Sequence, residues 1–434
     1  MNLIVLVTDT LRADHLGCYG NRDVTTPKID RLAEDGVVFT NTYADGLPTI
    51  PMRRVFHTGN TILPEGQWRP LLPDDVTVAQ ILGESGYTTG LIADCYHMFK
   101  PGLNFHEGFD SWQWIRGQES DRWHSGPRDV VDVSRHIPEH LRTERWEQRL
   151  TQYLLNMQDR EGEADYIVAR SCRAAMQWLE RNADNAPFML WLELFDPHEP
   201  WDPPPRLREK YFDDYPAEQF HFGYGVDTSL VREEDMPAIR ALYEAEIEFV
   251  DEWVGRLLDH VDEMGLRDDT AIVFTSDHGT HLGEQGCLQK TPSLLKSIVA
   301  QIPLIVRHPD ESHAGTRIDA LTSGMDIAPM LMRLTGTEDH PPMDGEDLWR
   351  LVEDEVQALH DWVLTRFRDF VAARTEDWHY FQGLRASDPG HGPALYDLNA
   401  DPGETTNVVE EHPEVVEQMR DLLSGCFTLE DRQT

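Results

Sequence analysis

The chain has 434 residues, a length that suits a large α/β core with a smaller subdomain. Asp and Glu total 78 against 38 Lys and Arg, so the formal net charge is −40. Nucleic acid and anionic membranes both require a cationic surface, and this balance therefore argues against either as a partner.

Short apolar runs alternate with helical patterns along the chain. Five runs are typical of buried parallel strands, at 3–9, 88–94, 188–195, 270–277 and 303–309. Helices are predicted at 26–36, 76–86 and 241–265, and the first two end at a glycine. Strands that alternate with helices indicate a mostly parallel sheet covered on both faces.

Two stretches interrupt this alternation. Residues 110–160 are rich in Trp, Arg and acids, show little periodicity, and predict an insertion or lid. Residues 196–235 begin with the Pro-rich DPHEPWDPPP and are expected to be extended or turned. After about residue 355 the pattern favours short antiparallel strands. We therefore expect an α/β core over 1–354 and a small C-terminal antiparallel subdomain over 355–434.

The N-terminus lacks the ordered regions of a signal peptide and begins directly with a predicted strand. No apolar run approaches the roughly 20 residues of a membrane span. The five cysteines lack C-x-x-C spacing, and their odd number fits reduced thiols. These features favour a cytoplasmic protein with no membrane partner; the oligomeric state cannot be predicted.

Two predicted strands end in an acidic residue. Asp9 closes the first strand, and Asp277 closes the strand at 270–277 and is followed by His278. Ligands collect at the carboxyl ends of parallel strands, so these side chains would converge if the strands are neighbours. Two carboxylates and an imidazole suit a divalent cation. The alternative is that each aspartate caps a following helix.

The segment LPTIPMRRVFHTG at 47–59 contains a candidate nucleophile. Pro48 and Pro51 constrain the backbone around Thr49, whose hydroxyl would ionise more easily on a metal. Arg53 follows within one turn, and its guanidinium could hold the Thr49 side chain or an anionic ester. The alternative is a helix capped by Thr49, with a solvated arginine.

Seven segments resemble, in order, the successive blocks of the sulfatase family of the alkaline phosphatase superfamily. They are LIVLVTDTLRADHLGCYG, TPKIDRLAEDGVVFTNTYA, TIPMRRVFHTG, FDPHEPWDPP, VFTSDHGTHLGEQG, PLIVRHP and ALYDLNADPGETTNV, and they span nearly the whole chain. The resemblance implies an alkaline-phosphatase-like α/β fold, with a three-layer catalytic core, a mostly parallel central sheet and a small C-terminal antiparallel subdomain.

The resemblance also implies roles for individual residues. Asp9, Asp277 and His278 match metal ligands, with Thr49 beside them on the metal. Thr49 also matches the nucleophile of the family's Cys/Ser-x-Pro-x-Arg frame, and Arg53 matches the arginine of that frame. His198 matches a histidine that contacts the ester or aids the leaving group. Lys290 matches the lysine that holds the transferred group.

Thr49 departs from the family pattern. Sulfatases of this family oxidise Cys or Ser to formylglycine, whereas oxidation of threonine would give a ketone, so no formylglycine is expected. Superfamily relatives that cleave phosphate diesters or transfer phosphoryl groups use an unmodified threonine. The family's Gly-Lys-Trp-His block is also missing. IADCYHMFKPG stands in its place, which predicts substrate contacts by Tyr96, His97 or Lys100.

Together these features predict an enzyme that hydrolyses the sulfate or phosphate ester of a saccharide or other small molecule through Thr49. One divalent metal is expected; Ca²⁺ is favoured, and Mg²⁺, Mn²⁺ or Zn²⁺ are alternatives. A second metal would need further ligands, for which Asp196, His198 and His281 are candidates. The functional alternatives are a catalytically inactive sulfatase-like binding protein, and a phosphodiesterase or phosphotransferase rather than a true sulfatase.

The excess of acidic residues predicts a halophilic protein, adapted to a high-salt interior; an ordinary acidic protein is the alternative. Molar salt reduces the electrostatic screening length to about 3 Å and so weakens repulsion among surface carboxylates. We expect the midpoint of thermal unfolding to rise as KCl is increased from dilute buffer to molar concentration. Full stability in dilute buffer would contradict the halophilic interpretation.

Overall fold

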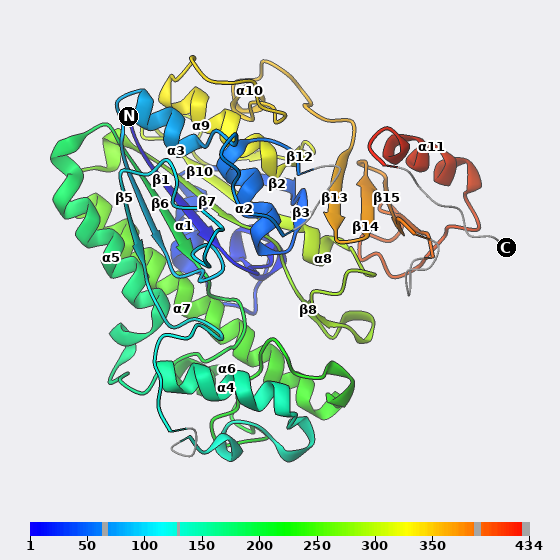
Figure 1. Cartoon of the computed structure of the whole chain (residues 1–434). Coiled ribbons are helices and arrows are strands. Elements are labelled where there is room, and N and C mark those ends of the chain that lie inside the picture. Colours follow the sequence, from blue (N-terminus) through cyan, green and yellow to red (C-terminus); the bar gives the residue numbers. More distant parts are fainter. Residues whose placement is uncertain (63–67, 128–130, 386–391, 428–434) are drawn as a thin grey trace.

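The computed structural model describes residues 1–62, 68–127, 131–385 and 392–427. A central sheet lies between helices on both faces, and a smaller sheet stands to one side of it (Figure 1). This architecture confirms the predicted α/β fold, with a mixed, mostly parallel central sheet and a small antiparallel sheet.

Nine strands form the central sheet within the described residues. Their order is β11 (Thr316–Ile318), β2 (Val37–Tyr43), β10 (Gln301–Arg307), β7 (Thr270–Ser276), β1 (Asn2–Thr8), β6 (Phe188–Leu194), β4 (Thr88–Ala93) and β5 (Ser111–Trp114), while β12 (Thr322–Ser323) pairs with β2. β1 is parallel to both neighbours, and Thr8 lies opposite Leu194 on β6 and Ser276 on β7. The carboxyl ends of these three strands therefore meet at one edge of the sheet.

All five apolar runs predicted as strands lie in this sheet, as β1, β4, β6, β7 and β10. β10 is antiparallel to both β7 and β2, so the expectation of a parallel strand at 303–309 was wrong. A run that is buried on both faces is apolar in either direction, and its pattern does not report orientation. The connection from β7 contains only short elements, β8 (His281–Leu282), β9 (Leu288–Gln289) and α8 (Ser297–Ala300), and no long crossover helix.

The side chains of β1 alternate between two apolar clusters, one on each face of the sheet. Ile4 and Leu6 pack with α1 (Pro27–Glu34), α5 (Ile167–Asn182) and α7 (Met236–Glu263). Leu3, Val5 and Val7 pack with α2 (Thr49–Thr58), α3 (Val78–Glu84), α9 (Ile327–Thr335) and α10 (Trp349–Val352). The predicted helices at 26–36, 76–86 and 241–265 correspond to α1, α3 and α7. Among the helices described, none is apolar over enough length to cross a membrane.

Residues 110–160 contain more regular structure than their pattern predicts. β5 forms the edge of the central sheet, and α4 (Glu144–Asn156) begins where the Thr143 side chain accepts a hydrogen bond from the backbone of Trp146. Leu150 and Tyr153 share the buried face of α4 with Trp146 at helical spacing. The many charged residues between these positions obscured that spacing. Residues 196–235 are largely irregular as expected, with one short helix, α6 (Pro205–Tyr211).

The small sheet contains four successive antiparallel strands, β13 (Val363–Phe367), β14 (Phe370–Arg374), β15 (Trp378–Gly383) and β16 (Ala394–Asp397). α11 (Pro413–Ser424) packs on it through a separate apolar cluster that includes Val371, Tyr380 and Met419. A short strand from the N-terminal part, β3 (Gly46–Leu47), adds to this sheet in parallel with β13. The small sheet is thereby bonded directly to the segment that leads to Thr49.

A buried carboxylate ties the small sheet to the core. Glu404 is 2 % exposed and accepts hydrogen bonds from the backbone and hydroxyl of Ser297 in the core and from Arg374 on β14. His379 on β15 lies 3.0 Å from the same carboxylate. Burial alone would raise the pKa of Glu404, but His379, Arg374 and Ser297 together hold it well below its ordinary value.

Replacement of Glu404 tests whether its contacts stabilise the small sheet against the core. Glu404→Gln leaves Arg374 and His379 without their buried partner, so we expect a loss of about 3 kcal/mol in the free energy of unfolding near pH 7. A group whose pKa is depressed by folding contributes its full stability above its unfolded pKa, here near 4.5, and loses it as the pH falls. Urea unfolding from pH 7 to pH 3 should therefore show the difference from wild type shrinking. The exposed Glu417→Gln is the matched control, and an equal loss in both variants would contradict the prediction.

Candidate active site

Three predicted metal ligands converge at the carboxyl edge of the central sheet. Asp9 and Asp277 follow the paired ends of β1 and β7, and His278 comes next. One ligand atom from each lies within 4.8 Å of the other two, and all three side chains are fully buried. In the part of the chain that the structure describes, no other set of three His, Cys, Asp or Glu side chains meets this criterion. The structure thus brings together the residues that the strand ends predicted.

Thr10 holds the two carboxylates in place. Its hydroxyl donates to Asp9 Oδ1 at 2.7 Å, and its backbone N–H donates to Asp277 Oδ1 at 2.9 Å. Thr10 adopts a φ of +67°, which is unusual for a β-branched residue and turns both donors toward the carboxylates. It acts through these two ligands, a role that its identity alone did not indicate.

Arg53 lies among three buried carboxylates. Its Nε donates to Glu193 at 3.0 Å, and its Nη1 donates to Asp277 and lies 3.0 Å from Asp9 Oδ2. Among the described residues its hydrogen bonds therefore run to carboxylates rather than to Thr49, the partner that the sequence suggested. Glu193 was not predicted; the available signal was a single acid within the buried run FMLWLELF.

The net charge of this cluster is negative and would be balanced by a cation. Three carboxylates against one guanidinium give a net charge of two negative, and burial lowers the pKa of His278 to about 4, so its imidazole is neutral. Burial also raises the pKa of Asp277 and of Glu193. Asp9 Oδ2, which lies 3.0 Å from Arg53 Nη1, and His278 Nε2 are both buried, and neither forms a hydrogen bond with a described residue. A divalent cation would balance the charge and contact both atoms, so these residues fit a metal.

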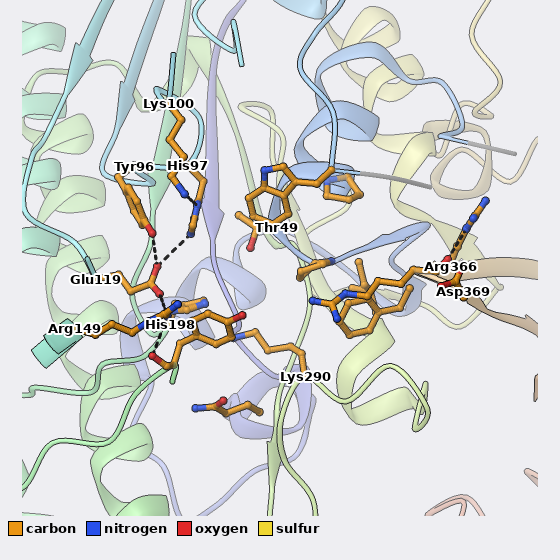
Figure 2. A pocket seen from close by; sticks show the side chains of 18 of the residues that line it. Thr49, Tyr96, His97, Lys100, Glu119, Arg149, His198, Lys290, Arg366 and Asp369 are labelled. Carbon is orange, nitrogen blue, oxygen red and sulfur yellow. Dashed lines mark hydrogen bonds and ion pairs between the residues drawn. The ribbon is translucent and has the colours of Figure 1, made fainter. Parts of the chain in front are cut away.

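A cavity of about 710 Å³ contains the other predicted site residues. Thr49, His97, Lys100, His198 and Lys290 all line it. Thr49 is the first residue of α2 and has a φ of +21°. Figure 2 shows Thr49, His198 and Lys290 turned toward the same space. Thr49 thus stands between this cavity and Arg53, which lies one helical turn further along α2.

His198 is held in a defined tautomer. Its Nδ1 lies 2.6 Å from the carbonyl oxygen of Glu199, which can only accept, so Nδ1 carries the proton. The ring stacks on Phe195 with centroids 4.1 Å apart. Burial, with a further contribution from Lys290, lowers the pKa of His198 to about 3. His198 is therefore neutral near pH 7 when no ligand is bound, and Nε2 is the atom available for proton exchange.

Lys290 is fixed by a carboxylate that sequence reasoning missed. Its Nζ lies 3.0 Å from both carboxylate oxygens of Glu199, which is fully buried. The lysine follows directly after β9 and lines the cavity. The family resemblance predicted His198, but nothing in the sequence distinguished the glutamate that follows it. Glu199 positions both catalytic candidates, Lys290 through its side chain and His198 through its backbone.

Glu119 organises another wall of the cavity. Its carboxylate accepts from Tyr96 at 2.8 Å and from Arg149 at 3.2 Å, and it lies 3.3 Å from His97 Nε2 (Figure 2). Lys100 Nζ lies 3.0 Å from His97 Nδ1. Burial would raise the pKa of Glu119, but His97 and the other partners hold it at about 2, so it stays ionised. The region 110–160 therefore contributes Glu119 and Arg149 to the cavity, and neither was predicted.

The candidate ligands for a second metal are not assembled into a site. Asp196 accepts from Gln118, His198 is bonded to Glu199, and His281 Nε2 lies 3.1 Å from the carbonyl of Leu294. Within the described residues these three do not form a ligand group of the kind made by Asp9, Asp277 and His278. Among the described residues, the structure assembles one group of possible metal ligands.

Two family models together cover nearly the whole chain. One described as Sulfatase matches residues 1–337. The chain belongs to the sulfatase family. A second model, described as N-sulphoglucosamine sulphohydrolase, C-terminal, matches residues 283–427 and includes strands β13 to β16 of the small sheet. The expectation of a sulfatase-family hydrolase is confirmed at this level.

Similar proteins agree with this assignment. The chain is 24% identical to N-acetylglucosamine-6-O-sulfatase of Bacteroides thetaiotaomicron, over 94% of this chain and 82% of that protein. It is 27% identical to human iduronate 2-sulfatase, over 76% of this chain and 64% of that protein. Among solved structures, phosphonate monoester hydrolase of Agrobacterium radiobacter has a TM-score of 0.77 at 22% identity, covering 98% and 95% of the two chains. A second structure, in complex with its substrate D-glucosamine-2-N,6-O-disulfate, has a TM-score of 0.72 at 22% identity, covering 98% and 97%. These two structures support the fold.

The buried charge cluster predicts that a metal stabilises the protein. Saturation with Ca²⁺ at 100 times its dissociation constant should add about 2.7 kcal/mol to the free energy of unfolding. We expect a chelator to lower the thermal midpoint and Ca²⁺ to restore it, with a smaller effect of Mg²⁺. Asp277→Asn should abolish the response to Ca²⁺, while Asp259→Asn, at a half-exposed aspartate paired with Lys28, should preserve it. A midpoint that is insensitive to chelator in the wild type would argue against the metal.

Proposed function

We propose that the protein hydrolyses the sulfate or phosphate ester of a saccharide or other small molecule, with an unmodified Thr49 as nucleophile. The observation that carries the proposal is the place of Thr49 at the N-terminus of α2, facing a cavity that also contains His198 and Lys290. Backbone N–H groups at a helix N-terminus favour an anion. An ester with negatively charged oxygens therefore suits this end of the cavity.

The reaction has two displacements at the same atom. Thr49 loses its hydroxyl proton to solvent, Oγ attacks sulfur or phosphorus, the bond from Oγ to that atom forms, and the bond to the leaving oxygen breaks. Water then attacks the same atom and releases a proton to solvent, the bond to Thr49 Oγ breaks and Oγ takes up a proton, and sulfate or phosphate is released. Lys290 and the N-terminus of α2 stabilise the charge on the non-bridging oxygens in both steps. A divalent cation held by Asp9, Asp277 and His278 would lower the pKa of the Thr49 hydroxyl and stabilise the same charge.

His198 supplies a proton to the leaving oxygen in this scheme. With Nδ1 committed to the Glu199 carbonyl, only Nε2 can exchange a proton with the substrate. The free enzyme holds His198 neutral, so the ring must first gain a proton. Binding of an anionic ester raises the pKa of a neighbouring imidazole and favours that uptake. The leaving oxygen is thereby neutralised as its bond breaks.

Aromatic side chains at the rim of the cavity favour a saccharide. Trp68 is 42 % exposed and Tyr224 is 39 % exposed, and both line the cavity. The flat apolar faces of these rings suit the faces of sugar rings. The sulfatase of Bacteroides thetaiotaomicron with similarity over most of this chain acts, by its name, on N-acetylglucosamine 6-O-sulfate, which agrees with a saccharide here.

Replacement of Thr49 tests the nucleophile. Thr49→Val keeps the shape of the side chain and removes the hydroxyl, so we expect turnover to fall about a thousandfold or more. Thr49→Ser keeps a hydroxyl and should retain measurable turnover. Thr335→Val, on α9 and outside the cavity, is the matched control and should match the wild type. The substrates are nitrophenyl sulfate, nitrophenyl phosphate and a nitrophenyl phosphodiester, each with Ca²⁺ and with chelator.

The outcomes separate the functional alternatives. Full turnover by Thr49→Val would refute Thr49 as the nucleophile. Preference for the diester would identify a phosphodiesterase, and transfer of phosphate to an added alcohol would identify a phosphotransferase. No turnover of any substrate by a wild type that binds Ca²⁺ would support an inactive binding protein.

A further inference from the structure

The cavity has the opposite charge balance to the chain as a whole. Its lining includes six basic side chains, Lys100, Arg149, Lys290, Arg366, Arg368 and Arg385. Among the described residues that line it, two are acidic, Glu119 and Asp369, although acids outnumber bases two to one in the sequence. A concentration of cations in one cavity of an acidic protein indicates an anionic ligand.

Three of these six cations already have an acidic partner, and Lys100 Nζ lies 3.0 Å from His97 Nδ1. Lys290 pairs with Glu199, Arg149 with Glu119, and Arg385 with Asp369. Arg366 and Arg368, near the end of β13, form no ion pair with a described residue. With Lys100, these two arginines carry the positive charge in the cavity that no described carboxylate pairs with.

Arg366 is buried with an unused donor. The residue is 7 % exposed, its Nε donates to the backbone oxygen of Arg368 at 2.8 Å, and its Nη1 is buried without a hydrogen-bond partner. A buried guanidinium that lacks a partner for one of its nitrogens is costly unless a ligand supplies it. Because Arg366 lines the cavity, that ligand would come from the cavity.

Strand pairing fixes both arginines beside the nucleophile. Arg366 and Phe367 of β13 lie opposite Gly46 and Leu47 of β3, two residues before Thr49. Paired strands lie about 4.8 Å apart, so this end of β13 runs beside the chain that enters α2. Arg368 follows at once, with a φ of +56°. Figure 2 shows Arg366 on the opposite side of Thr49 from Glu119 and Arg149.

We propose that Arg366 and Arg368 form an anion subsite, which binds a second negatively charged group of the substrate, a carboxylate, sulfate or phosphate, next to the ester at Thr49. The proposal rests on the proposed function for the position of the ester. Guanidinium groups suit the task because they bind planar and tetrahedral oxyanions through two nitrogens at once. The preferred substrate class is therefore a dianionic or polyanionic ester rather than a singly charged one.

Direct binding tests the subsite without requiring turnover. The protein carries Thr49→Val in all cases and is titrated calorimetrically, with Ca²⁺ present, with benzyl sulfate and benzyl phosphate and with the same esters bearing a ring carboxylate. We expect the carboxylated esters to bind about tenfold more tightly, which is the gain expected from one hydrogen bond between charged groups. Arg366→Met and, separately, Arg368→Met should reduce that ratio toward one. Arg368 is exposed, so its variant tests the proposal even if Arg366→Met fails to fold.

A charge-matched control separates the subsite from the general field of the protein. Arg31→Met, on α1 and paired with Asp35 and Asp259, also removes one positive charge and should leave the ratio unchanged. Equal binding of the two kinds of ester, no binding of either, or a ratio unaffected by both arginine substitutions would overturn the subsite. Turnover by the wild type is measured separately. Its absence, with the carboxylate preference retained, would refute the proposed function and leave the subsite standing.

Discussion

The position of the candidate nucleophile depends on one buried interaction, the guanidinium of Arg53 among the carboxylates of Asp9, Asp277 and Glu193. The acids come from the ends of three adjacent strands, and the arginine comes from α2. Because Thr49 lies four residues before Arg53 on the same helix, drawing the guanidinium into the strand ends also places Thr49 above them. The same cluster leaves two negative charges uncompensated, which a divalent cation would balance.

A second constraint acts on the other side of Thr49. β3 ends two residues before it and is paired with β13, so the chain entering α2 is bonded to the small sheet. Thr49 is thus fixed by the pairing of β3 on its N-terminal side and by Arg53 on its C-terminal side. It adopts a φ that threonine ordinarily avoids, and such backbone strain is common at functional sites. The small sheet is itself tied to the core by Glu404. This sheet thus contributes to the geometry of the site as well as to the wall of the cavity.

The sequence predicted the features that have local patterns. Buried strands are continuous apolar runs, and those that end in acid led directly to Asp9 and Asp277, while the family resemblance supplied Thr49, His198 and Lys290. The partners of these residues were not predictable. Arg53 and Glu193 are 140 positions apart, and their contact exists only once β6 lies beside β1. Arg366 was equally hidden, because its place beside Thr49 depends on the pairing of β13 with a two-residue strand. The direction of β10 was not predicted because a strand buried on both faces is apolar in either direction. The helix α4 was not predicted because charged residues obscure its apolar spacing.

The acidic surface and the cationic cavity act on an anionic substrate over different distances. Repulsion of an anionic substrate by a net charge of −40 acts over many ångströms, and salt removes most of it beyond the screening length of about 10 Å at 0.1 M. Contacts inside the cavity act at hydrogen-bond distance, far below the screening length. The charge of the whole chain therefore affects how fast an anion arrives, whereas the few cations of the cavity decide how tightly it binds. Since three of the six are already paired with an acid, the proposed subsite favours an anion that reaches the unpaired arginines at the end of β13.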